Sequence, residues 1–169
     1  MRSILFIVIF NILSIVSLSA EIVYIDINYI INSSDVGKIL NKKIKLINDK
    51  NIQKFKTLEN DLIKKEQALL AQENILEKTE FTKKISELSD EIKKYREEKK
   101  ITQNELNQFK LTNTKKIVNL LNPIITEYVE VNSILLVIPK KNIIVGKKNL
   151  DITNAILEIF NNKEFKINF

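Results

Sequence analysis

The sequence has 169 residues, of which 44% are hydrophobic and 28% are charged, and its formal net charge is +6. Because it contains no His and no Cys, it lacks the commonest general base near neutral pH, the usual zinc ligands, a thiol nucleophile and any disulfide. The acidic residues follow helical periodicity and do not gather around Gly-rich loops, so we predict that the chain is not an enzyme and uses no cofactor or metal.

The positive charge comes almost entirely from Lys. It favours acidic partners, and a weak contact with an anionic membrane surface is among them. The alternative explanation for the excess of Lys is a compositional bias of the genome toward Lys and Asn. A nucleic-acid partner is not predicted, because Arg96 is the one Arg after residue 20 and the Lys residues are dispersed around the expected helices.

Residues 1–20 have the plan of a secretory signal peptide: a positive residue (Arg2), an apolar run over 4–16, and small residues at Ser17, Ser19 and Ala20. The run is shorter than the ~20 residues that a membrane-spanning helix needs, so cleavage is favoured over anchoring. Ser19 and Ala20 both offer a cleavage position. An uncleaved membrane anchor is the alternative.

Residues 22–27 alternate as a strand does, with Val23, Ile25 and Ile27 on one face. From about Val36 the pattern becomes helical. Two series of apolar residues then follow heptad spacing, which is typical of a coiled-coil seam. The first series is Leu40, Ile44, Ile47, Phe55, Leu58, Leu62, Leu69 and Leu76, and the second is Phe81, Ile85, Leu88, Ile92, Tyr95, Leu106, Phe109, Ile117, Leu120 and Ile124.

Polar residues interrupt both seams, at Lys65, Gln72, Lys99, Thr102 and Asn113. Between the two series the heptad phase slips, and Thr79 is a candidate N-cap. We therefore predict two antiparallel helices with a reversal near 77–79. One continuous helix is the alternative, because no Gly or Pro enforces the turn. A helix of some forty residues rises about 60 Å, so the hairpin must project from the rest of the chain.

Pro123 predicts either a kink in the second helix or a new helix capped by Asn122. Residues 133–138 and 143–146 read as two strands of a hairpin with Pro139 in the turn. Asp151 or Thr153 then caps a short amphipathic helix. We expect the strands at the two ends of the chain to pair. This predicts an α+β fold, mostly α, with a long coiled-coil hairpin on a small β body.

This order of elements resembles the Skp/OmpH family of periplasmic chaperones. The segments that carry the resemblance are EIVYIDINYIINSS at 21–34 and SILLVIPKKNIIVGKKNLDITNAIL at 133–157, including the family's Asp-Ile-Thr pattern at Asp151, Ile152 and Thr153. The two arms match in pattern and not in identity. Near the expected tip the charges are nearly balanced, unlike the dense Arg/Lys tip of some members, so no tip contact with lipopolysaccharide is predicted.

The resemblance implies a homotrimer in the periplasm that holds unfolded outer-membrane β-barrel proteins soluble without ATP. It divides the chain into a signal peptide (1–20), a trimerisation body (21–35 and 132–169) and an arm (36–131). We expect the shared core of the body to contain Val23, Ile25, Ile27, Ile134, Leu136, Ile138, Ile143 and Val145; no client-binding residue is assigned. A structural coiled-coil spacer or adaptor of the bacterial envelope is the alternative function.

Overall fold

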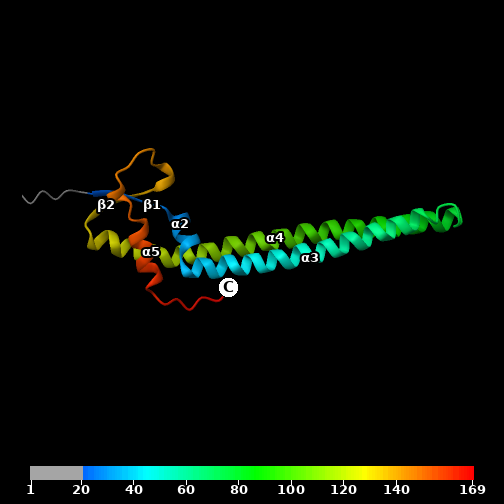
Figure 1. The fold of residues 1–169 in the computed structure, drawn as a ribbon, viewed down its shortest axis with the longest axis horizontal. Helices are drawn as coiled ribbons and strands as arrows, with labels where there is room; N and C mark the ends of the chain where they lie inside the picture. Colours follow the sequence, from blue (N-terminus) through cyan, green and yellow to red (C-terminus); the bar gives the residue numbers. More distant parts are fainter. Residues whose placement is uncertain (1–20) are drawn as a thin grey trace, which may run out of the picture.

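A computed structural model describes residues 21–169, and the predicted signal peptide lies outside them. The chain forms a small base from which one long helical hairpin projects (Figure 1). The elements are β1 (Glu21–Ile25), α2 (Ile27–Ser33), α3 (Asp35–Leu70), α4 (Lys78–Val131), β2 (Ile134–Pro139), two 3₁₀ turns (Lys140–Asn142 and Lys148–Leu150) and α5 (Thr153–Asn161). The predicted fold class, a helical hairpin on a small β part, is confirmed. Among residues 21–169, no helix combines the length and the apolar character needed to cross a membrane.

The first strand is shorter than predicted, because a helix that the sequence analysis missed begins at Ile27. The Asp26 carboxylate accepts a hydrogen bond from the Tyr29 N–H at 2.9 Å and so caps α2. Ile30 and Ile31 of this helix are buried. The prediction that Ile27 lies in the strand is therefore wrong: it is the first residue of α2 and is half-buried against the core.

The two arm helices differ in length. With 36 and 54 residues, α3 and α4 rise about 54 Å and 81 Å at 1.5 Å per residue. The chain reverses over 71–77, a few residues before the predicted position, and Thr79 lies inside α4 while Glu77 occupies the N-cap position. The reversal needs no glycine, since short-range bonds such as Gln72 N–H to Leu69 O (3.0 Å) close it.

Pro123 lies inside α4, so the prediction of a new helix capped by Asn122 is wrong. Proline removes the hydrogen bond to the carbonyl of Asn119, four residues earlier. Asn119, Asn122 and Pro123 are all exposed, so water can satisfy that carbonyl. Because Pro123 lies on the solvent side of α4, the helix can continue through it.

The strands at the two ends of the chain pair, as predicted, and the pairing is parallel, with Ile22 opposite Leu136 and Tyr24 opposite Ile138. Because α4 is longer than α3, it extends past β1. The chain then turns back, and β2 runs beside β1 in the same direction as β1 (Figure 1). The predicted hairpin of 133–138 with 143–146 is wrong. Ile143 and Val145 lie in an irregular segment between the two 3₁₀ turns, with no strand partner within residues 21–169.

The core lies where the end of α4 meets the sheet, α2 and α5. Its fully buried side chains include Ile30, Leu40, Ile117, Leu121, Ile156 and Phe160. Along the arm, every residue of the predicted seams is buried or half-buried except Ile85, which is exposed. The aromatic residues lie in the seam as predicted, and the rings of Phe55 and Tyr95 meet edge to face at 5.9 Å.

Asn113, one of the predicted seam interruptions, is buried with 4% of its surface exposed. The Nδ2 group of its side-chain amide donates to the Phe109 carbonyl at 2.8 Å, but the Oδ1 atom has no partner among the described residues. An unsatisfied buried carbonyl costs about 1–3 kcal/mol. We therefore expect Asn113→Leu to raise the free energy of unfolding by about 1 kcal/mol, measured by urea denaturation. Exposed Asn107→Leu is the control, and a destabilised Asn113→Leu protein would contradict the assignment.

Candidate functional site

The Asp151-Ile152-Thr153 segment lies along the edge of β1 that β2 does not occupy. The Ile152 N–H donates to the Tyr24 carbonyl at 3.0 Å, and Tyr24 and Asp151 form an isolated parallel bridge. One edge of β1 is thus paired with β2 and the other with this segment. Within the described chain, the outer edge of β2 therefore remains the open edge of the sheet.

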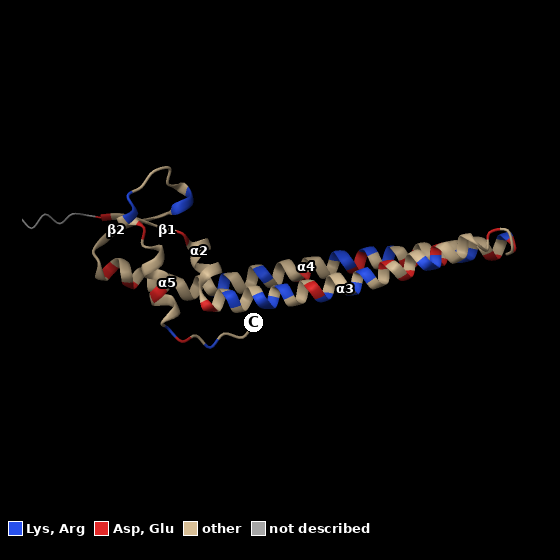
Figure 2. Cartoon of the chain, in the orientation of Figure 1, with Lys and Arg blue, Asp and Glu red and all other residues tan. Residues whose placement is uncertain are grey.

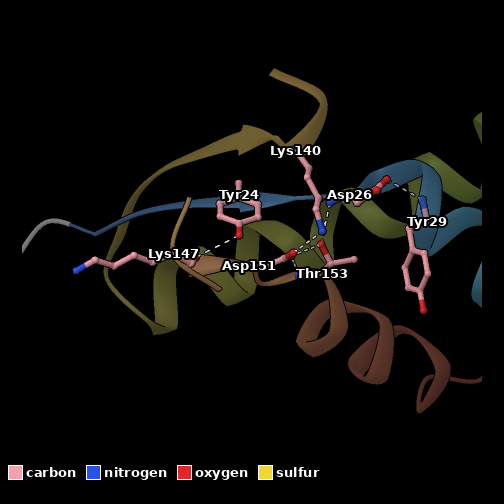
Figure 3. Close-up of polar contacts among 7 residues, drawn as sticks. All are labelled: Tyr24, Asp26, Tyr29, Lys140, Lys147, Asp151 and Thr153. Atoms are coloured by element: carbon pink, nitrogen blue, oxygen red, sulfur yellow. Dashed lines mark hydrogen bonds and ion pairs between the residues drawn. The ribbon is translucent and has the colours of Figure 1, made fainter. Parts of the chain in front are cut away.

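The polar side chains of this segment join the two ends of the chain (Figure 3). The Thr153 hydroxyl accepts the Asp26 N–H at 2.9 Å and donates to the Asp151 carboxylate. Asp151 also accepts the Thr153 N–H at 3.0 Å and the Lys140 ammonium at 2.7 Å. The prediction that Asp151 or Thr153 is the N-cap of this helix is wrong, because Ile152 is the N-cap residue of α5. Asp151 lies one position before that N-cap and accepts the N–H of the first helical residue, Thr153.

Three further residues of this site were not predicted as site residues: Tyr24, Asp26 and Lys140. Tyr24 is buried, its hydroxyl donates to the Lys147 carbonyl at 3.2 Å, and the Lys140 ammonium lies 5.9 Å from its ring centroid. Asp26 directly follows a strand and precedes apolar residues at 27, 30 and 31, a pattern that indicates an N-cap. Nothing in the local sequence around Tyr24 or Lys140 indicates their long-range contacts.

The charge of Asp151 is stabilised by this arrangement. Partial burial opposes ionisation, but hydrogen bonds from Lys140 and Thr153 outweigh it and hold the pKa of Asp151 below its ordinary value. The hydrogen bond to Asp151 raises the pKa of Lys140. Asp151 therefore contributes stability that is present above the ordinary pKa of about 4 and is lost as the pH falls through the lower folded-state value.

We expect Asp151→Asn to destabilise the protein more at about pH 7 than at an acidic pH below the lowered pKa of Asp151, where protonation already removes the charge that the substitution removes. Urea denaturation at the two pH values measures the difference. Asp35→Asn, at an exposed carboxylate of α3, serves as the control for the loss of a surface charge. An equal loss for Asp151→Asn at both values would contradict the role of its charge.

The structure divides the eight residues predicted for a shared body core. Val23, Ile25 and Ile134 are buried within the chain's own core. Ile27, Ile138 and Ile143 are half-buried, whereas Leu136 and Val145 are exposed. The burial of the first three within one chain means that a contact with a second copy would use the exposed members of this set.

The base exposes apolar side chains on β1, on β2 and in the irregular segment after β2. We call this set the base apolar residues: Ile22, Leu135, Leu136, Ile144 and Val145. Ile144 and Val145 are 99% and 89% exposed, and Leu136 is 50% exposed. Ile22 and Leu136 are opposite each other in the sheet and so share a face. A two-stranded sheet is marginal on its own, and an apolar open edge favours pairing with another chain.

The arm has a different surface. Lys alternates with Asp and Glu along both helices, and the segment before the turn is largely uncharged (Figure 2). Apolar side chains are exposed at intervals along α3, at Ile39, Leu46, Ile52, Ile63 and Leu70. Within residues 21–169 no cluster of acidic side chains could hold a metal ion. The arm therefore offers many separate weak contacts.

Comparisons with known proteins agree with this arrangement. The family described as "Outer membrane protein (OmpH-like)" matches residues 21–160. The fold is similar to the crystal structure of an OmpH-like protein from Caulobacter crescentus CB15, a candidate outer membrane chaperone, with a TM-score of 0.77, 15% identity and 88% of each chain covered. At this identity the similarity establishes the fold alone. No curated protein matches the sequence.

Proposed function

Because the chain belongs to the OmpH-like family, we propose that it is an ATP-independent holdase of the periplasm that binds unfolded outer-membrane β-barrel proteins. Family membership supports a chaperone function at the level of the family, and it supports the prediction that the chain is not an enzyme. The client class and the mechanism are the proposal.

The observation that carries the proposal is the projecting arm with separate exposed apolar residues. An unfolded β-barrel protein has no fixed shape, but its future strands present apolar side chains at many points. The apolar side chains along α3 can each contribute a weak contact, and simultaneous contacts raise the overall affinity without a deep pocket. Polar interruptions such as Asn113 loosen the seam, which suits an arm that adapts to different clients.

The proposed assembly is a homotrimer in which three bases associate and three arms surround the client. The base apolar residues and the open edge of β2 support this arrangement, since association would remove both from water. We further propose that residues 1–20 are a cleaved signal peptide, that residues 21–35 and 132–169 form the trimerisation body, and that 36–131 form the arm. The four lysines at 140, 141, 147 and 148 favour a weak contact with an anionic membrane surface.

Light scattering tests the proposal. A urea-unfolded β-barrel protein is diluted into buffer without nucleotide, with or without a few-fold excess of the mature protein. We expect the protein to suppress the rise in scattering. A structural spacer would leave aggregation unchanged, so an unaltered scattering trace would contradict the holdase function and favour the spacer.

A further inference from the structure

The segment after α5 alternates between half-buried apolar and exposed polar side chains. Phe165, Ile167 and Phe169 are half-buried, whereas the residues between them, Lys166 and Asn168, are exposed. A period of two is the pattern of an extended chain with one face on an apolar surface. Residues 163–169 nevertheless belong to no sheet: they follow α5 and run back beside the start of the arm (Figure 1).

The segment lies on an apolar face of the base. The ring of Phe165 packs on buried Phe160 with centroids 4.8 Å apart, and Phe165 and Phe169 both pack against the core cluster, as does Ile44 of α3. At one end, Lys163 pairs with Glu127 of α4 at 3.3 Å. At the other, the Lys43 ammonium of α3 donates to the Phe169 carbonyl. The segment therefore lies against α3, α4 and α5.

The backbone contributes little to holding this segment in place. Among the N–H groups of residues 164–169, Ile167 N–H alone donates to the protein, to the Phe165 carbonyl at 3.2 Å. The Lys163–Glu127 ion pair and the hydrogen bond from Lys43 to Phe169 are both exposed, and exposed polar contacts of this kind add little stability. Attachment thus depends on alternate apolar side chains, and another extended chain with the same alternation could take the place of the segment.

We propose that the face covered by residues 163–169 is a binding site for extended client segments with aromatic or aliphatic residues at alternate positions, and that 163–169 occupies it within the free protein. Strands of outer-membrane barrels have this alternation, with aromatic residues near both ends. This inference rests on the proposed function, because it names where on the base a client strand docks. The client segment and residues 163–169 compete for the site.

The test uses the full mature chain carrying Phe165→Ser and Phe169→Ser, which releases the segment and opens the site. A fluorescent peptide with the sequence of residues 162–169 is titrated by anisotropy. We expect it to bind the double variant about tenfold more tightly than the unaltered chain, in which the site is mostly occupied. A peptide of the same composition with its three apolar residues consecutive should not bind.

The matched control is Glu164→Ser with Asn168→Ser, which changes the exposed side of the same segment and should leave peptide affinity as in the unaltered chain. Equal peptide affinity for the double variant and the unaltered chain would overturn the proposal. If circular dichroism shows the double variant unfolded, Phe169→Ser alone is used. A chain that this single change also unfolds would overturn the proposal, since the segment would then be part of the core.

The two proposals fail separately because the peptide titration contains no client. A chain that binds the peptide but does not suppress aggregation of a barrel protein would refute the holdase function alone. A chain that suppresses aggregation but shows no alternation-dependent peptide binding would refute the site alone. When both proposals hold, the chain with Phe165→Ser and Phe169→Ser should bind an unfolded barrel protein about five- to tenfold more tightly than the unaltered chain.

Discussion

The Gly37→Ala variant is expected to lose about 3 kcal/mol of its free energy of unfolding, although alanine is the better helix former by about 1 kcal/mol. A Cβ atom on Gly37 would lie 1.6 Å from the carbonyl oxygen of Ile31 and 3.0 Å from Oγ of Ser34. The clash is with backbone, so no side-chain rotation relieves it. The junction between α2 and α3 would have to open.

Urea denaturation followed by circular dichroism measures this loss. Lys42→Ala, at an exposed position in the following turn of α3, should change stability by no more than about 0.5 kcal/mol. A Gly37→Ala protein as stable as the unaltered one would show that the close approach of α2 to α3 is absent in solution. The sign of the change is the informative part, since helix propensity alone predicts stabilisation.

The Leu136→Lys variant is expected to abolish assembly and, with it, client holding. Leu136 is half-exposed beside Ile22 in the two-stranded sheet, and the proposed trimer buries it against another copy. An unpaired charge buried at the interface costs about 3 kcal/mol or more, which weakens association more than a hundredfold. Sedimentation velocity should show monomers of the variant at a micromolar concentration at which we expect the unaltered protein to sediment as the proposed trimer.

Leu111→Lys tests whether any added charge has the same effect, because Leu111 is exposed on α4 along the arm. This variant should remain trimeric. A Leu136→Lys protein that sediments as a trimer would show that the face of the sheet bearing Ile22 and Leu136 is not the interface. Because Leu136 is exposed in the single chain, the substitution should leave the folded monomer intact, and circular dichroism verifies this.

The arm was predictable from sequence because heptad spacing persists over many turns. Phe55, Leu62 and Leu69 on α3 are spaced by seven residues, and the burial of Phe55 and Leu69 follows from that shared phase. The turn was placed late because its residues include no Gly or Pro, so the sequence lacked the usual signal. The seam interruption at Asn113 was also recognised from its heptad position.

The base was less predictable because its contacts join residues more than a hundred positions apart. Tyr24 and Lys147, or Asp26 and Thr153, meet only because α4 runs past β1 and the chain returns parallel to it. The helix α2 was missed because its isoleucines and asparagines favour strands and turns locally. Residues 143–146 have strand-forming side chains, but no strand within residues 21–169 pairs with them.

The most direct test of the holdase account is the mass of the complex formed without nucleotide. A labelled, urea-unfolded β-barrel protein is diluted to nanomolar concentration into a solution of residues 21–169 and analysed by analytical ultracentrifugation. If the chain is a trimeric holdase, a soluble species that contains one client and three copies of the chain should form. A client that pellets in the presence of the protein as it does alone would contradict the holdase account.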